Sequence, residues 1–404
     1  MGIPRAYSPT PLFLFQSGKN SNQTAKPLFT DFKQDGIGTP LFKKGRGCLA
    51  FLLSVFKDIY PEKNEVLIPA YNAQSLAFAT IHNGLKIKLV DIQQKSFFPS
   101  YEQYLNSISD KVLAAILPYN WGVFPEINEL IKITDEFKKN HIFWIDDFAS
   151  SYPLNDHLQY FKMNSPCQFF SFGKTKTLSL IDGGYAFIPQ SSLYYKLFHE
   201  TFAKANSEKI LISKKKYDIS KTIENFLYHI YTNRIGYSIL SYLGPGRNDH
   251  PPKTSEINME IQSVGWENTL EKIIETKLNE TLQYRLNVNK KYHQHLTQLN
   301  NSQLHLFPST LNNVGSRFPL LFRSKEIRDE VRRKLIEKQI GVSTGHDKWL
   351  NEIELIRPFL NNIREENYPE AVEFQHRLLT LPAHERVDKK SISIICDIIK
   401  KILV

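Results

Sequence analysis

Two lysines, Lys174 and Lys176, lie close together in the segment Ser171–Gly184, which begins with a serine and ends in two glycines. Short, largely aromatic runs on either side, 167–170 and 185–188, have the pattern of strands. A lysine amine presented on the connection between two strands can form a Schiff base with an aldehyde cofactor such as pyridoxal phosphate. The alternative interpretation is that these are ordinary surface lysines of a basic protein.

Two adjacent carboxylates, Asp146 and Asp147, follow the apolar run 141–145. The ends of such strands face the ligand crevice of an α/β sheet. A pyridoxal enzyme needs one carboxylate to keep the pyridine nitrogen protonated, so that the ring can accept electrons. Asp147 is the candidate for this role, whereas Asp146 could equally cap the N-terminus of a following helix.

The segment from Ser171 to Leu178, continuing to Asp182-Gly183-Gly184, resembles the sugar aminotransferases of the DegT type, which are fold-type-I pyridoxal-phosphate enzymes. The resemblance covers most of the chain. It implies that Lys176 carries the imine and that Ser171 contacts the cofactor phosphate. It also implies that Asp147 is the partner of the pyridine nitrogen. Lys174 falls on a variable position of the family pattern, although the sequence alone leaves it as an alternative.

A glycine turn, Gly45-Arg46-Gly47-Cys48, opens an apolar helical run. Free backbone amides at a helix N-terminus form a ready phosphate site, although the same turn can be purely structural. The resemblance assigns phosphate binding to Arg46, Gly47 and Cys48.

The chain departs from the family pattern at two positions near the expected cofactor ring. Ala73 stands where many members place an aromatic residue, and Ser150 stands where they place His or Gln. Tyr71 and Asn72 are therefore the candidates for contacts beside the ring, with Ser150 as a third. Tyr71 could instead be a core aromatic residue.

The composition is that of an ordinary globular protein of 404 residues, with 41% hydrophobic and 23% charged residues. The net charge of +10 suits an anionic substrate, and no nucleic-acid-binding motif accompanies it. We expect neither a membrane-spanning segment nor a signal peptide. The three cysteines are far apart and lack the spacing of metal ligands, which predicts a cytoplasmic protein without a metal site.

Strand patterns alternate with helical runs along the first half of the chain, which indicates βαβ units. The expected fold class is α/β, like fold-type-I pyridoxal-phosphate transferases: a large domain with a mainly parallel sheet flanked by helices, and a small C-terminal α+β domain. We expect an extended N-terminal arm over 1–44, the large domain over 45–255 and the small domain over 256–404. The boundary follows a breaker cluster at 243–252.

The family resemblance further implies transfer of an amino group, from glutamate, to a keto sugar carried on a nucleotide. It implies a homodimer, for which the basic, aromatic stretch 190–255 is the candidate contact, although that stretch could be a plain packing helix. Arg317 and His384 are the candidates for substrate contact, with a surface salt bridge and a structural turn as their alternatives. A non-catalytic descendant of the fold and a pyridoxal enzyme acting on a small amino acid remain alternative functions.

Overall fold

The computed structural model describes residues 2–5, 7, 36–39, 41–180, 182–192, 194–196, 198–200, 226–230, 232–243, 264–299, 303–360 and 363–403. Within them, a seven-stranded sheet has the order β1-β8-β7-β5-β4-β2-β3. Its strands are β1 (Gly36–Gly38), β2 (Glu65–Pro69), β3 (Lys86–Val90), β4 (Val112–Pro118), β5 (Phe143–Asp147), β7 (Gln168–Ser171) and β8 (Gly184–Pro189).

The central strands of this sheet are parallel, from β3 through β2, β4 and β5 to β7, while β8 and β1 pair antiparallel at one edge. Every residue of β4, VLAAILP, is buried, as expected for a parallel strand covered on both faces. The connecting helices are α1 (Gly45–Ile59), α2 (Gln74–His82), α3 (Tyr101–Leu105), α4 (Ile127–Lys139) and α5 (Asn155–Asn164).

The strand order reverses at β2, because the chain moves from β2 to β3 in one direction and from β4 to β5 in the other. Since βαβ crossovers are right-handed, α2 and α4 must cover opposite faces of the sheet. Ligands of doubly wound sheets bind at such a switch point, beyond the carboxyl ends of the strands. The fold thus places a crevice beyond the ends of β2, β4 and β5.

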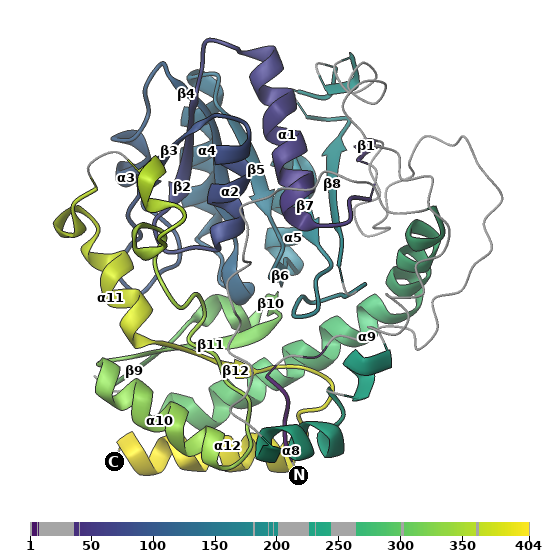
Figure 1. Cartoon of the computed structure of the whole chain (residues 1–404), viewed down its shortest axis with the longest axis vertical. Coiled ribbons are helices and arrows are strands. Elements are labelled where there is room, and N and C mark those ends of the chain that lie inside the picture. The colour runs from purple at the N-terminus through teal and green to yellow at the C-terminus, as the bar shows by residue number, and fades with distance from the viewer. Residues whose placement is uncertain are drawn as a thin grey trace.

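The C-terminal part of the chain forms a three-stranded antiparallel sheet in the order β12-β11-β9, which lies below the large sheet in Figure 1. The elements of this part are α9 (Val264–Leu296), β9 (Leu304–Leu306), β11 (Arg317–Phe322), α10 (Lys325–Glu337), α11 (Pro369–Arg377), β12 (Leu378–Pro382) and α12 (Lys389–Leu403). Most of them contribute to a second hydrophobic cluster, whereas the buried residues of α11 belong to the cluster of the large sheet.

A small two-stranded sheet joins the two parts. In it β6 (Ser151–Tyr152), which follows the end of β5, pairs antiparallel with β10 (Val314–Gly315), which precedes β11. This pairing carries the beginning of β11 to the crevice of the large sheet.

The α/β architecture with a mainly parallel sheet and a small C-terminal α+β part is therefore confirmed. The boundary expected at 255 and 256 lies outside the described residues, and so does the breaker cluster 243–252 except for Leu243, the last residue of α8 (Arg234–Leu243). Of the expected N-terminal arm, Gly36–Gly38 forms edge strand β1, and Ile3 makes a parallel bridge to Ile340 of the C-terminal part. In the stretch 190–255, α8 (Arg234–Leu243) is helical as expected. None of the described helices is both long and apolar enough to cross a bilayer.

Candidate active site

A pocket opens at the switch point of the large sheet, where residues from both parts of the chain meet. Its walls come from the N-terminus of α1, the ends of β2, β4 and β5, the loop after β7, the beginning of β11 and the loop around 346. The lining residues are Lys44, Gly45, Arg46, Leu49, Asn72, Ala73, Ser75, Leu76, Asn120, Trp121, Asp147, Ala149, Ser150, Phe169, Ser171, Thr175, Lys176, Ser316, Arg317 and His346.

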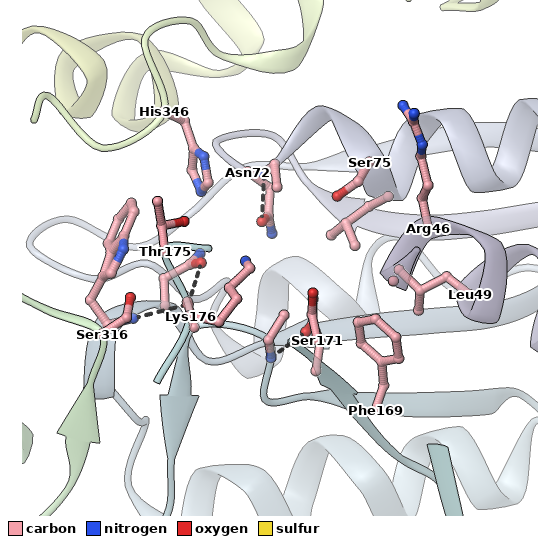
Figure 2. A pocket seen from close by; sticks show the side chains of 18 of the residues that line it. Arg46, Leu49, Asn72, Ser75, Phe169, Ser171, Thr175, Lys176, Ser316 and His346 are labelled. Carbon is pink, nitrogen blue, oxygen red and sulfur yellow. Dashed lines mark hydrogen bonds between the residues drawn. The ribbon is translucent and has the colours of Figure 1, made fainter. Parts of the chain in front are cut away.

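Lys176 is the lysine that the loop after β7 directs into the pocket (Figure 2). The loop turns back at this point, with the Lys176 N–H donating to the Gly173 carbonyl at 3.0 Å. Lys174, by contrast, is exposed, and its carbonyl accepts a hydrogen bond from the Tyr228 hydroxyl at 3.0 Å. Lys176 is thus the lysine placed for chemistry in the pocket, whereas the side chain of Lys174 is placed in solvent.

Burial lowers the pKa of the Lys176 amine. The negative charge of Asp147 opposes this shift, and the positive charge of Arg317 reinforces it. A lowered pKa leaves more of the amine neutral, which is the nucleophilic form.

Asp147 and Asp146 face opposite sides of β5, as successive residues of a strand must. Asp147 lines the pocket and accepts a hydrogen bond from the Ala149 N–H at 2.8 Å. Burial raises its pKa to about 6, and the charge of Lys176 opposes the rise. Asp146 instead accepts hydrogen bonds from Tyr119, at 2.7 Å, and from Ser165. Asp146 therefore belongs to a buried polar cluster, and its alternative interpretation as a helix N-cap is wrong.

The N-terminus of α1 packs directly on the end of β7. A Cβ atom added to Gly45 would lie 2.9 Å from the Ser171 Oγ, so a larger residue there would force the Ser171 side chain to move. Arg46 and Ser171 both line the pocket beside it. The first amides of a helix have no acceptor within the helix and can bind an anion.

Gly47 and Cys48, which we expected at the phosphate, are outside the described lining of the pocket. Their N–H groups donate to the Lys44 carbonyl at 3.0 and 3.3 Å, because they belong to the second half of the first helical turn. The side chain of Cys48 is fully buried and lies 3.8 Å from the Thr39 hydroxyl. Of the three residues that the resemblance assigns to the phosphate, Arg46 lines the pocket, and Gly45 lines it beside Arg46.

Asn72 lies in the pocket wall at the end of β2. Its Oδ1 accepts a hydrogen bond from the Ala73 N–H at 2.7 Å, while its buried Nδ2 has no hydrogen-bond partner among the described residues. Tyr71, expected beside the ring, points away into the core. Its hydroxyl donates to the backbone of the 344–346 loop and accepts from the His346 N–H at 3.0 Å. The core interpretation of Tyr71 is therefore the correct one.

Ser150 lines the pocket, but its hydroxyl is used within the protein. It accepts a hydrogen bond from the Trp121 N–H at 3.2 Å and lies 3.4 Å from the Asn120 Oδ1. In the described part of the chain, the buried Nδ2 of Asn120 has no partner. Ser150 thus fixes the turn after β4.

Arg317 enters the pocket from the beginning of β11, with its guanidinium 5.7 Å from the centre of a Trp121 ring. His384 does not reach the pocket. It is fully buried, and its Nε2 lies 2.8 Å from the Pro4 carbonyl oxygen. Burial lowers the pKa of His384 to about 3. The expected substrate contact of His384 is therefore corrected to a structural one with the N-terminal residues.

Several pocket residues were not anticipated from the sequence: Lys44, Gly45, Trp121, Thr175, Ser316 and His346. They lie in turns far apart in the chain. The Gly-x-Gly turn that begins at Gly45 is the one signal for them in the sequence. Nothing in the sequence pattern around His346 indicates a site.

The charges of the pocket are strongly unbalanced. Four cationic residues, Lys44, Arg46, Lys176 and Arg317, line it together with a single carboxylate, Asp147, among the described residues. Lys44 also pairs with Asp182. A pocket of this charge attracts an anionic ligand.

These features fit pyridoxal phosphate. The half-buried Lys176 can bind the aldehyde, and Asp147 can meet the ring nitrogen. The cradle of Gly45, Arg46 and Ser171 suits the phosphate, and the unpaired Nδ2 of Asn72 can meet an acceptor of the ligand. The fold and this pocket define a fold-type-I pyridoxal-phosphate enzyme.

Comparison with known proteins leads to the same class. Residues 44–207 match the model of the DegT/DnrJ/EryC1/StrS aminotransferase family. This match to a family of pyridoxal-phosphate-dependent aminotransferases covers less than half of the chain, and it confirms the resemblance found in the sequence. No curated protein matches the chain.

Solved structures share the fold over nearly the whole chain. Helicobacter pylori PseC, an aminotransferase involved in the biosynthesis of pseudoaminic acid, has a TM-score of 0.68 at 15% identity, covering 100% of this chain and 99% of its own. The PLP form of Streptococcus pneumoniae Spr1654 has a TM-score of 0.68 at 17% identity, with coverage of 100% and 99%. Bacillus subtilis NtdA with bound cofactor PMP has a TM-score of 0.62 at 14% identity, with coverage of 94% and 78%.

Proposed function

We propose that this protein is an aminotransferase that moves an amino group from glutamate to a keto sugar carried on a nucleotide, in the biosynthesis of amino sugars and surface polysaccharides. The observation that carries the proposal is the half-buried Lys176 beside Asp147 in a cationic pocket at the strand ends. When bound, pyridoxal phosphate supplies an aldehyde for the amine and a ring that accepts electrons.

The residues of the chain have separate tasks in this proposal. Lys176, with its lowered pKa, holds the cofactor and moves the proton at the reacting carbon. Asp147 holds the proton on the ring nitrogen. The first amides of α1, together with Arg46 and Ser171, would hold the phosphate, and the Asn72 Nδ2 would donate a hydrogen bond to the cofactor.

The charge of the pocket supports the substrate class. A nucleotide sugar adds a diphosphate to the phosphate of the cofactor, and Lys44, Arg46 and Arg317 provide positive charge for these groups. PseC, which shares the fold, is an aminotransferase involved in the biosynthesis of pseudoaminic acid. We further propose a homodimer, with the stretch 190–255 as its contact. The cytoplasmic location stays a prediction from the cysteine pattern.

Ala73 favours a second candidate, a non-catalytic or regulatory protein that retains the fold. It lines the pocket at the position where the family places an aromatic residue, so the ring has no aromatic support from this position. A pyridoxal enzyme of a small amino acid uses the same cofactor residues and differs in its amino acceptor.

The absorbance spectrum with added pyridoxal phosphate tests the proposal. We expect the wild type to show the visible band of a lysine-linked cofactor, Lys176→Ala to lose it, and the matched control Lys174→Ala to keep it, because Lys174 is exposed. A wild type without the band would favour the non-catalytic candidate. Given the band, turnover of glutamate with small keto acids, and with no nucleotide keto sugar, would favour the amino-acid enzyme.

A further inference from the structure

Trp121 adopts an unusual backbone conformation in the pocket wall, with φ 51° and ψ 35°. Such a left-handed conformation of a residue other than glycine costs on the order of 1 kcal/mol. Contacts on two sides hold it in place. Ser150 accepts the Trp121 N–H, and a Cβ atom added to Gly315 of β10 would lie 2.2 Å from the Trp121 carbonyl group. The structure thus stabilises a strained turn that presents the indole in the pocket.

His346 stands beside this indole, with the two ring centres 5.0 Å apart and the planes tilted by 36°. The Tyr71 hydroxyl fixes its backbone, accepting the His346 N–H at 3.0 Å. The left-handed Gly345, with φ 78°, brings the loop so close that a Cβ atom there would lie 2.9 Å from the Trp121 ring. The position of His346 is therefore set by its contacts with Tyr71 and Trp121.

The imidazole of His346 is neutral and available to a ligand. Burial lowers its pKa to about 3, and the charges of Lys176 and Arg317 add to the shift. Its Nε2 is buried and has no hydrogen-bond partner anywhere in the described structure. A buried polar atom without a partner is uncommon in proteins and calls for an explanation, and a bound ligand supplies one here.

The pocket has two ends, with Lys176 between them. Figure 2 shows Arg46, Leu49 and Phe169 towards one end and His346 with Ser316 towards the other. The first end holds the phosphate cradle. A molecule that reacts at Lys176 while the cofactor phosphate occupies that cradle must place its remaining atoms towards Trp121 and His346.

We infer that Trp121 and His346 form the subsite for the ring of the amino acceptor, and that this ring is an uncharged, hydroxylated one. The indole face packs against the C–H groups of the ring, and the His346 Nε2 pairs with a hydroxyl group. A neutral imidazole beside an aromatic face is a poor site for the second carboxylate of a dicarboxylate such as glutamate. The guanidinium of Arg317 suits that carboxylate better. This inference rests on the proposed function and names the residues that recognise its sugar.

An aminotransferase reacts with its two substrates in separate half-reactions. The subsite can therefore be tested by comparing the loss of kcat/KM for the keto sugar with the loss of kcat/KM for glutamate. We expect His346→Phe and Trp121→Ala, in the holoenzyme, to lower kcat/KM for a UDP-4-keto-6-deoxyhexose about tenfold more than for glutamate, the scale of one lost hydrogen bond or ring contact. His346→Gln, which can still offer a hydrogen bond, should recover part of the loss. Lys174→Ala is the matched control.

Calorimetry provides a readout that is independent of turnover. UDP-glucose should bind the wild-type holoenzyme more tightly than UDP does, and His346→Phe should abolish that difference while leaving UDP binding within about twofold. Equal losses for glutamate and the keto sugar, or an unchanged difference between UDP-glucose and UDP, would overturn the subsite.

The test also separates this inference from the proposed function. A wild type that reacts with glutamate yet binds UDP-glucose no better than UDP refutes the sugar subsite and leaves an aminotransferase with another acceptor. A wild type without a glutamate half-reaction refutes the aminotransferase proposal itself.

Discussion

Adjacent carboxylates at the end of β5 have different environments because strand geometry alternates the faces. Asp146 receives hydrogen bonds from Tyr119 and Ser165, and burial still raises its pKa to about 7. Asp147 receives one hydrogen bond, from the Ala149 N–H, and faces the pocket. A buried carboxylate facing a cavity lowers stability unless a ligand meets it, which is the usual conflict between stability and function.

We expect Asp147→Asn to stabilise the cofactor-free protein at pH 8 while weakening cofactor binding. The pKa of Asp147 is about 6 in the folded protein, above its ordinary value of about 4, so the folded state binds the proton more tightly than the unfolded state. The stability of the wild type therefore falls as the pH rises from about 4 to about 6, and the penalty persists above that range.

Removing the charge of Asp147 should raise the free energy of unfolding by up to about 2–3 kcal/mol at pH 8 and by little at pH 4. Melting temperatures of the two proteins across this range measure the effect, with the exposed Asp110→Asn as control. A difference that does not vary with pH would contradict the raised pKa.

For single residues, the sequence shows which side chains can take part in chemistry more reliably than it shows which of them lie in the pocket. Seven residues proposed from the sequence line one pocket: Lys176, Asp147, Ser171, Arg46, Asn72, Ser150 and Arg317. Tyr71 and His384 do not, because a side chain at a strand end can turn either into the crevice or into the core, and packing decides which. The position of His346 depends on a loop folding back from the C-terminal part onto Tyr71, a contact that no local pattern encodes.

Among the elements, the carboxyl ends of the parallel strands do not all serve the pocket. Asp91, directly after β3, faces away from it and caps α11, accepting the N–H groups of Glu370 at 3.2 Å and Ala371 at 3.0 Å. The strand pattern places Asp91 at the edge where ligands of such sheets bind, but Asp91 is outside the described lining of the pocket. Whether such a residue meets a ligand or another helix depends on the position of α11 in space.

Asp91→Ala should lower the free energy of unfolding by about 1 kcal/mol, the usual effect of removing a helix cap. It should leave the visible band of the bound cofactor unchanged, because Asp91 lies outside the described lining of the pocket. Urea unfolding measures the change, and Glu373→Ala, at an exposed position of the same helix, is the matched control. An equal effect of both substitutions would rule out the cap.

For the whole molecule, the residues near the N-terminus pack against the C-terminal part. Ile3 belongs to the second hydrophobic cluster, and its N–H donates to the Gln339 carbonyl at 2.9 Å. Tyr7 stacks on Tyr228, with the ring planes 7° apart. The sequence predicted an arm but not its contacts, because these involve residues hundreds of positions away.

Arg285 of α9 joins these distant segments, and we expect Arg285→Lys to destabilise the protein by about 3 kcal/mol. Its buried guanidinium donates to the carbonyls of Ser316 and Ala383, both at 3.0 Å, and of Tyr7 at 2.7 Å. A lysine ammonium is a point charge without the planar fork, so it cannot satisfy all three acceptors. Thermal unfolding measures the loss, with Lys290→Ala, exposed on the same helix, as control.

Arg285→Lys should also change substrate binding in the pocket, because Ser316 lines the pocket and Arg317 follows it directly in the chain. Releasing the Ser316 carbonyl frees the beginning of β11, so Arg285→Lys should raise the KM for an anionic substrate several-fold, as expected for the loss of about one hydrogen bond. Restoring stability with saturating cofactor should not restore that KM, since the cofactor does not replace the lost donor. If KM returned to the wild-type value, the coupling between Arg285 and the pocket would be one of overall stability alone.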